Sequence, residues 1–336
     1  MKQLLEPLLA LGAALAVSGV IIALSGGDPL LAFAALAEGA FGSADSLSEV
    51  GVKTCPLLLT GLAVALAFRT GVWNIGAEGQ LMMGGMAMAA LGTSVDALPG
   101  AMGLTLCLLA AAAAGGTWAF IAAALKVRRN VNEIISTIML NFIALGLISY
   151  LVQGPFMEAG GRYPQTDAIS AAVSMPRLFT GHRVHLGILL ALLLAAAMQF
   201  LLFRTVAGYE MRAAGLNQNA SRLAGIDVSR RLVFAFVLSG ALAGIAGAIE
   251  VSAITRRMYE NFSPGWGFTA IAVALLGRLS PAGVVVAAIF FGVLDAGSNA
   301  MQRVAGVSSV LVLVIQATVI LFLVLFEQRN REATVQ

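Results

Sequence analysis

Long apolar runs with almost no charge recur along nearly the whole chain, and they limit its fold more than any other feature. Several exceed about 18 residues, the length at which an apolar run indicates a membrane-crossing helix rather than part of a soluble core. Only 11% of the 336 residues are charged, against about 25% in soluble domains. Too few polar side chains are therefore present to cover a water-facing surface, and the sequence predicts an all-helical, polytopic membrane protein.

We predict about ten transmembrane or re-entrant helices. The first, 7–25, is interpreted as a retained membrane helix, because Glu6 and Pro7 interrupt the start of what could otherwise be a signal peptide. The run at 265–277 is too short for a plain crossing, so a half-crossing or re-entrant segment is expected there. The predicted segments are 7–25, 50–68, 75–93, 99–125, 131–153, 184–203, 231–252, 265–277, 282–299 and 309–327.

The distribution of Lys and Arg predicts the orientation. With the N-terminus inside and the segments alternating, 13 of the 20 basic residues fall on the inner side and 7 on the outer side. Inner loops carry the excess of positive charge in membrane proteins. Both termini are therefore expected in the cytoplasm, with 154–183 forming an outer loop and 204–231 an inner loop.

Two stretches interrupt the apolar pattern with glycine and polar residues. The first is "GVWNIGAEGQLMMGG" at 71–85, and the second is "NFSPGWGFTA" at 261–270. Each is followed by an apolar run and a Pro–Gly restart, and the predicted topology places the two breaks on opposite sides. This pattern indicates an inverted repeat, with one copy at about 50–153 and the other at about 231–327, inside a single transmembrane domain 1–336. Inverted-repeat carriers place the solute path at such broken helices.

Polar and aromatic residues at the breaks are therefore candidates for the translocation path. The alternative at the first break is an interfacial turn whose Trp73 belongs to the aromatic belt. Asn141 lies within an apolar helix, where its amide needs either another helix or the path as partner, while Asn132 and Glu133 are expected to cap that helix. The path candidates are Trp73, Asn74, Glu78, Gln80, Asn141, Trp266 and Phe268.

Four blocks carry a family resemblance. They read "FRTGVWNIGAEGQ", "VNEIISTIMLNFIAL", "YEMRAAGLNQNASRLAGI" and "FSPGWGFTAIAVALLGRLSPAG". Together they resemble permease subunits of ABC importers for ribose, other simple sugars, branched-chain amino acids and nucleosides. The version "GVWNIGAEGQ" is most similar to the nucleoside and simple-sugar branch.

This resemblance implies a transport subunit and not an enzyme, without cofactor or catalytic residues. The chain has no G-x-x-x-x-G-K-[ST] phosphate-binding loop, so ATP hydrolysis would come from a partner. The implied partners are an ATP-binding subunit with two ATPase domains, a second permease that is identical or paralogous, and an extracytoplasmic solute-binding lipoprotein. The implied location is the bacterial cytoplasmic (inner) membrane.

The resemblance also implies a coupling helix in the inner loop, which docks on the ATPase. Tyr209 to Gly225 fits this role, with small residues for close packing and a turn with a cap near Asn217. The segment differs from the Glu-Ala-Ala pattern of other importer permeases, since Met211 and Arg212 follow Glu210. The coupling candidates are Tyr209, Glu210, Arg212, Ala213, Ala214, Gly215, Asn217, Arg222 and Gly225.

Two alternatives stay open for function. A stand-alone, ion-coupled secondary transporter would use carboxylates such as Glu78, Glu133, Glu250 or Asp295, and the same importer family could instead carry branched-chain amino acids. A metal site is not expected, because His182 and His185 share a loop with no further ligands, and Cys55 and Cys107 are interpreted as buried apolar residues.

Overall fold

The structure is a computed structural model that describes residues 2–95, 98–308, 310–318 and 321–322, with side chains from residue 12 onward. The chain divides into two compact units. Unit 1 comprises Met1–Thr54 and Ile289–Gln336, and unit 2 comprises Cys55–Ala288. Each unit is described by itself, and the candidate site lies entirely within unit 2.

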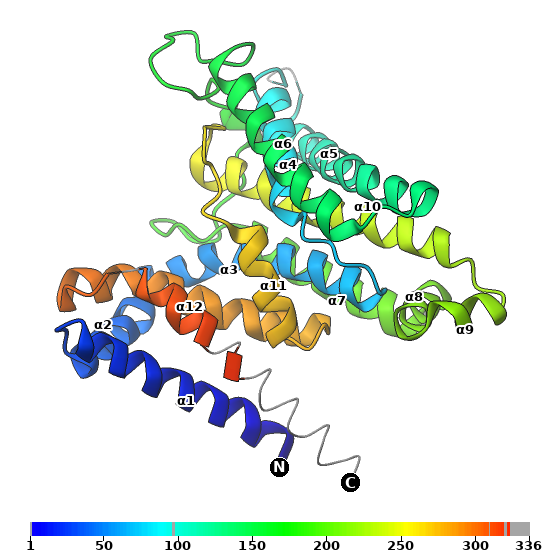
Figure 1. Ribbon diagram of the computed structural model, residues 1–336. Coiled ribbons are helices and arrows are strands. Elements are labelled where there is room, and N and C mark those ends of the chain that lie inside the picture. Colours follow the sequence, from blue (N-terminus) through cyan, green and yellow to red (C-terminus); the bar gives the residue numbers. More distant parts are fainter. Residues whose placement is uncertain (1, 96–97, 309, 319–320, 323–336) are drawn as a thin grey trace. The chain divides into compact units, whose positions relative to one another are not determined.

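Helices make up nearly all of the regular structure in the described residues (Figure 1). Over the same residues, strand-like pairing is limited to two isolated bridges, Gln165 with Tyr259 and Arg177 with His185. The helices are α1 (Lys2–Leu24), α2 (Pro29–Phe41), α3 (Ala44–Arg69), α4 (Ala77–Gly92), α5 (Gly100–Arg129), α6 (Glu133–Gln153), η1 (Ala171–Val173), α7 (Gly187–Arg204), α8 (Val206–Leu216), α9 (Gln218–Leu223), α10 (Val228–Glu250), η2 (Val251–Thr255), α11 (Trp266–Leu276) and α12 (Pro281–Ala305).

The prediction of an all-helical protein is confirmed over the described residues, but the number of spans is not. Six described helices are long and apolar enough to cross a membrane, or seven if the bent pair Gly12–Leu24 and Pro29–Phe41 is one span. Two predicted segments are shorter, because α4 has 16 residues and α11 has 11. The half-crossing length expected at 265–277 is thus confirmed. The predicted segment 309–327 lies partly outside the described residues, and the inverted repeat stays a prediction.

Unit 1 is built from the helices at the two ends of the sequence. The Asp28 side chain accepts a hydrogen bond from Leu30 N at 2.9 Å and caps α2, which bends away from α1 by 119°. Near the start of its unit 1 part, α12 packs closely on the first half of α3, where a Cβ added at Gly292 would lie 2.2 Å from Thr54 Oγ1. Farther along, α12 packs against α2.

Glycines allow three helices of unit 2 to touch through their backbones. A Cβ at Gly84 of α4 would lie 2.2 Å from the carbonyl oxygen of Gly244 in α10, and one at Gly244 would lie 2.3 Å from that of Ala111 in α5. A Cβ at Gly115 of α5 would likewise lie 2.2 Å from Gly240 O. Small residues give such close packing in membranes, where dispersion replaces the hydrophobic effect between helices. The α4, α5 and α10 bundle is the frame of the site.

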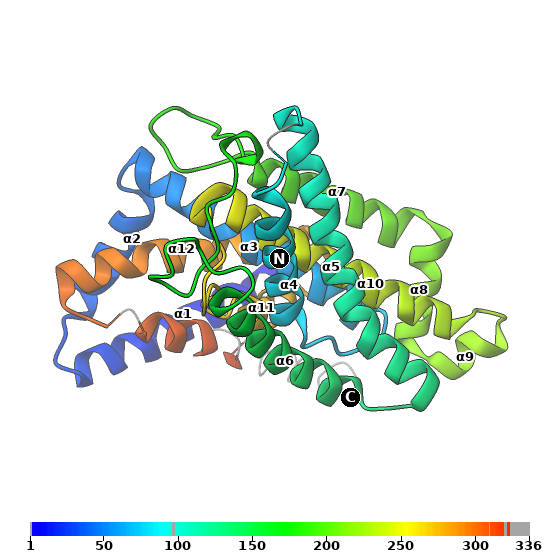
Figure 2. The same cartoon turned by 90° about the horizontal axis from the view of Figure 1, so that it is seen from above.

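Unit 2 has two distinguishable ends. At one end, here called the basic end, α3 and α5 finish, α6 and α10 begin, and Lys126 of α5 pairs with Glu133 of α6 at 2.9 Å. At the opposite end, here called the loop end, residues 154–186 cover the end of α4, with Ser170 N donating to Gly92 O at 2.8 Å. Seen from above, α8 and α9 lie beyond the ends of α7 and α10 (Figure 2).

We predict that Gly244→Ala lowers the free energy of unfolding by about 1–3 kcal/mol, because the added methyl forces α10 away from α5. Gly146→Ala is the matched control, since Gly146 is also helical but has open space around its Cβ position. That change should leave stability unaltered or raise it by about 0.5–1 kcal/mol. Thermal unfolding of the purified chain in detergent measures both, and equal midpoints would show that the glycine contact is not tight.

Candidate functional site

The chain breaks its helical path between α3 and α4. After Arg69 the backbone turns at Gly71, whose φ of 84° is the left-handed conformation that favours glycine. Residues 72–75 are not helical. Helix α4 starts at Ala77, and its N-cap residue is Gly76, so no side chain at that position caps the helix. Backbone groups freed by such a break need partners away from lipid.

Asn74 supplies one set of these partners and is itself fully buried. Its Oδ1 accepts from Gly76 N at 2.9 Å and from Gln80 Nε2 at 3.0 Å. Its Nδ2 donates to Gln80 Oε1 at 3.0 Å and to Ser239 Oγ of α10 at 2.9 Å. The Ser239 hydroxyl in turn donates to Ala63 O of α3 at 2.7 Å. The break is therefore tied to both α10 and α3.

Helix α6 supplies the second set. Asn141 Nδ2 donates to Ile75 O at 2.9 Å, and Asn141 Oδ1 accepts from Gly79 N at the same distance. The Thr137 hydroxyl accepts from Ile75 N at 3.3 Å. The Asn141 amide thus forms hydrogen bonds with a carbonyl and an N–H of the broken segment. Asn141 therefore contacts another helix, which is one of the two partners that the sequence analysis left open.

Glu78 joins the first break to the second. Its Oε2 accepts from Gly267 N at 2.7 Å, in the first turn of α11. A Cβ at Gly267 would lie 2.2 Å from Glu78 N, so the first turns of α4 and α11 are in backbone contact. The carboxylate lies at the N-termini of two helices at once, where negative charge is favoured by the helix dipole. We call this meeting of first turns, Ala77–Gln80 and Trp266–Phe268, the junction.

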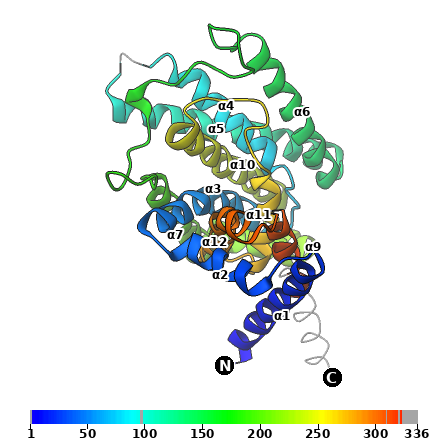
Figure 3. The same ribbon diagram turned by 90° about the vertical axis from the view of Figure 1, so that its left-hand side faces the viewer.

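The two half-helices approach the junction from opposite ends of unit 2. The segment 70–76 comes from the basic end, where α3 finishes, and α4 continues toward the loop end. Residues 256–265 come from the loop end after α10, and α11 continues toward the basic end. Figure 3 shows this segment as the loop that leads into α11. At that end Arg69 Nη1 donates to Leu279 O at 3.0 Å, just beyond α11.

The structure brings together most of the path candidates at the junction. Asn74, Glu78, Gln80, Asn141 and Trp266 are all buried. The two others are about half exposed: Trp73 packs its ring 4.5 Å from that of Phe68, and Phe268 lies in the first turn of α11. The sequence interpretation missed Ser239 and Thr137, whose only signal was a hydroxyl within an apolar helix.

The segment 205–225, for which the sequence predicts a coupling role and which we call the coupling segment, forms two short, well-capped helices. Thr205 caps α8, and Asn217 caps α9 by accepting from Asn219 N and Ala220 N at 3.0 Å, which confirms the predicted cap. Glu210 forms an ion pair with Arg231 of α10. The Arg212 guanidinium lies 5.0 Å from the centre of the Phe203 ring, with that of Arg69 at 4.9 Å. Glu210 and Arg212 thus serve contacts within unit 2.

Other side chains of the segment point to solvent. Leu216 and Leu223 are 90% and 92% exposed, and Tyr209 and Val206 are also exposed. Arg222 and Gly225 are exposed as well, whereas Ala214 is buried and Ala213 half-buried. We call Val206, Tyr209, Leu216 and Leu223 the exposed apolar set. The sequence analysis emphasised the arginines of this segment and overlooked its two leucines. Two leucines in an otherwise polar loop could have indicated an exposed apolar surface.

The coupling segment touches the break directly. A Cβ at Gly215 of α8 would lie 2.1 Å from Arg69 O and 3.2 Å from Gly71 N. Because Arg69 also binds Leu279 O, one residue connects α8 with the end of α11. Movement of α8 would therefore displace the backbone that leads into α4 and, through Arg69, the backbone that follows α11.

Metal-ligating residues are scattered in the described part of the chain, where no three His, Cys, Asp or Glu side chains are grouped for an ion. His185 is buried at the start of α7, and burial lowers its pKa to about 4, with the nearby Arg183 adding to the effect. Its imidazole is thus neutral near pH 7.

Comparison with known proteins gives a consistent result. Residues 46–324 match the family described as branched-chain amino acid transport system / permease component. A glucose ABC transporter permease protein of Haloferax volcanii is 40% identical over 96% of this chain and 87% of its own length. A guanosine ABC transporter permease protein of Bacillus subtilis is 40% identical over 96% and 93%. A second guanosine ABC transporter permease protein of the same bacterium is 30% identical over 72% and 77%.

We predict that Asn74→Ala destabilises the chain by about 1–3 kcal/mol, since it leaves Gly76 N and the Gln80 and Ser239 side chains without their partner. Asn219→Ala is the matched control, because Asn219 is exposed on α9, and surface changes stay within about 0.5 kcal/mol. Thermal unfolding in detergent compares the two variants. Equal stability of both would mean that the break is satisfied in another way.

Proposed function

Because the chain belongs to the family of branched-chain amino acid transport system permease components, we propose that it is the membrane-spanning subunit of an ABC importer for nucleosides or simple sugars. The observation that carries this proposal is the 40% identity, over almost the whole chain, to permeases for glucose and for guanosine. Both cargoes carry sugar hydroxyls. The cargoes of these two relatives favour sugar-bearing solutes over the branched-chain amino acids that the family description names.

The stand-alone, ion-coupled carrier is less well supported. Such a carrier needs carboxylates that can exchange partners with an ion, but Glu78 is held by the α11 backbone and Glu133 by Lys126. The exposed apolar set points instead to a protein partner, since a solvated turn gains nothing from leucines that are about nine-tenths exposed.

The proposed partners follow from what the chain lacks. No Lys in the sequence follows Gly, so a phosphate-binding G-K-[ST] loop is absent, and ATP hydrolysis is assigned to a partner with two ATPase domains. A solute-binding lipoprotein would deliver cargo outside. The second permease is proposed to be a paralogue rather than a copy, because one bacterium has two guanosine permease proteins that both resemble this chain.

The proposed location is the cytoplasmic membrane, with the basic end of unit 2 in the cytoplasm. Ten basic residues of unit 2 belong to this end and five to the loop end. The exposed apolar set lies at the basic end, where an ATPase could reach it. The basic-end residues are Arg69, Lys126, Arg128, Arg129, Arg204, Arg212, Arg222, Arg230, Arg231 and Arg278, and the loop-end residues are Arg162, Arg177, Arg183, Arg256 and Arg257.

We assign the coupling route to contacts within unit 2. Closure of the ATPase would push α8, and Gly215 would transmit this displacement to Arg69 and Gly71. Arg69 would move the end of α11 through Leu279 O, and α11, about 16 Å long as a rigid helix, would pull Gly267 from Glu78. Opening of the junction would then change access to the solute path. The opposed directions of α4 and α11 also support the proposed inverted repeat.

The function is tested by uptake of radiolabelled guanosine and glucose into membrane vesicles that hold the chain with its ATP-binding subunit, second permease and binding protein. ATP should drive accumulation of at least one of the two. A variant ATPase that binds but does not hydrolyse ATP should abolish it. Accumulation that persists with this variant, or that follows an ion gradient alone, would contradict an ATP-driven importer.

The docking role of the exposed apolar set is tested by Leu216→Gln and Leu223→Gln. Burying one leucine contributes about 1.5–3 kcal/mol, so each change should weaken binding of the ATP-binding subunit by about 10- to 100-fold. Leu186→Gln at the loop end is the control, since Leu186 is also an exposed leucine. Co-purification of the ATPase with each variant reports binding. Undiminished recovery with both coupling-segment variants would place the docking surface elsewhere.

A further inference from the structure

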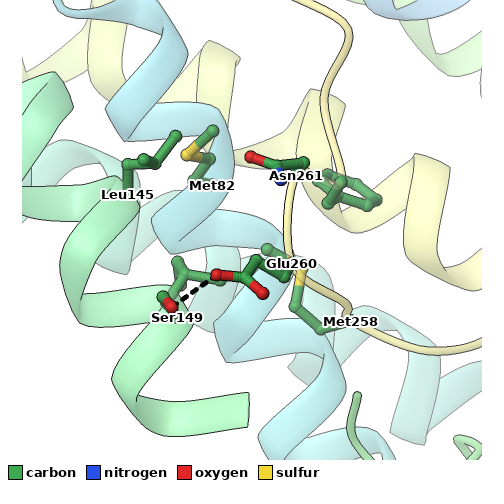
Figure 4. Close-up of a pocket in the computed structure, with 8 residues that line it drawn as sticks. Met82, Leu145, Ser149, Met258, Glu260 and Asn261 are labelled. Carbon is green, nitrogen blue, oxygen red and sulfur yellow. Dashed lines mark hydrogen bonds between the residues drawn. The ribbon is translucent and has the colours of Figure 1, made fainter. Parts of the chain in front are cut away.

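A pocket one helical turn from the junction is not used by the coupling route. It lies between α4, α6 and the segment 256–265, and Figure 4 shows its labelled side chains. Its cavity of about 10 Å³ has room for about one water-sized group. The lining residues are Met82, Leu145, Ile148, Ser149, Met258, Glu260, Asn261 and Phe262.

The pocket combines apolar walls with a few unused polar atoms. Glu260 Oε1 accepts from Ser149 Oγ at 2.6 Å and from Gln153 Nε2 at 3.3 Å. Within the part of the chain that the structure describes, Glu260 Oε2 and the Asn261 amide have no hydrogen-bond partner. The two side chains reach from the segment toward α4 and α6 (Figure 4). A carboxylate acceptor beside an amide donor and acceptor is thus available to a solute.

The segment that carries these groups is held in place by the outer loop. Thr166 N donates to Met258 O at 2.8 Å, and Met258 N donates to Thr166 Oγ1 at 3.1 Å. Arg257 pairs with Glu158 of the loop at 2.6 Å. The Phe262 ring is held edge-on between Tyr259 and Trp266, with centroids 5.9 and 6.2 Å away. The polar atoms are therefore positioned before a solute arrives, which reduces the ordering cost of binding.

We propose that this pocket is a subsite for the ring hydroxyls of the transported solute, with Glu260 and Asn261 as its hydrogen-bonding groups. Vicinal hydroxyls donate to a carboxylate and exchange hydrogen bonds with an amide, and the apolar walls accept the less polar ring edge. The cavity takes one hydroxyl, so the ring and its neighbouring hydroxyl lie over the exposed Asn261. This inference rests on the proposed function and gives the permease a share in choosing the sugar-bearing cargo.

The test uses Leu145→Cys as a reporter on the pocket wall, in the assembled importer without binding protein. The two native cysteines are buried and give a low background. Labelling by a water-soluble thiol reagent should be slowed about tenfold by guanosine or glucose at about ten times its Kd. An analogue without vicinal ring hydroxyls, 2′,3′-dideoxyguanosine, should protect much less than guanosine.

Glu260→Gln should weaken this protection about tenfold or more, because a hydrogen bond to a charged acceptor is lost. Glu38→Gln is the matched control: it makes the same substitution at an exposed carboxylate of α2, outside the pocket, and should leave protection within about twofold of the parent. Tyr163→Cys, exposed in the outer loop, reports the reactivity of thiols outside the pocket, and no probe should slow its labelling.

Three results would overturn the subsite. They are absence of labelling at Leu145→Cys, equal protection by guanosine and its dideoxy analogue, and unchanged protection in Glu260→Gln. ATP-driven uptake by the same vesicles, after the binding protein has been added, is measured in parallel. Normal uptake without protection would reject the subsite and leave the proposed function standing, whereas absence of ATP-driven uptake would reject the function itself.

Discussion

The need to satisfy broken backbone away from water governs the centre of unit 2. A helix that stops inside a membrane exposes N–H and C=O groups for which lipid has no partner. Here Asn74, Asn141 and Glu78 supply those partners, at 2.7–2.9 Å. The glycine contacts of α4 and α10 support this network, because they bring the two backbones close enough for short polar side chains to form hydrogen bonds between the helices. Without this network neither half-helix could begin where it does.

The same network makes the centre suited to switching. Its hydrogen bonds join segments far apart in sequence, and several end on backbone N–H groups that could find water if the helices parted. Glu78 is the most consequential member, since the N-termini of α4 and α11 both favour its charge. Separation of the two first turns would remove one of these helices from the carboxylate. Under the proposed coupling route, a modest displacement at α8 would pass through Gly215 and Arg69 to this junction.

Many of the helices and the break before α4 could be predicted from the sequence. The long-range contacts of the site could not be predicted, for a physical reason. Apolar runs predicted the long helices, glycine with polar residues predicted the break before α4, and length predicted that α11 is a half-helix. The cap at Asn217 was also predictable, because capping is local. The pairing of Glu78 with Gly267 spans 189 positions, and no spacing rule connects them. Ser239 and Thr137 were missed because a hydroxyl in an apolar helix more often bonds to its own helix.

The roles predicted for single residues stay predictions for a similar reason. The sequence identifies residue types that suit a solute path. It does not show which of these side chains form hydrogen bonds with the rest of the protein. Asn74, Gln80 and Asn141 do so, whereas Glu260 Oε2 and the Asn261 amide, which were not among the path candidates, have no hydrogen-bond partner within the described residues. Leu216 and Leu223 were overlooked because exposure depends on tertiary packing, which a loop sequence does not reveal.

The central claim is that the junction is closed at rest and opens when the partner ATPase binds nucleotide. Hydrogen exchange, read by mass spectrometry on peptides that cover 74–80 and 266–268 in the assembled importer, measures this directly. The account predicts slow exchange without nucleotide, because these amides donate to Asn74, Asn141 and Glu78, and faster exchange when ATP is bound. Fast exchange at rest, or the same slow exchange in both states, would contradict it.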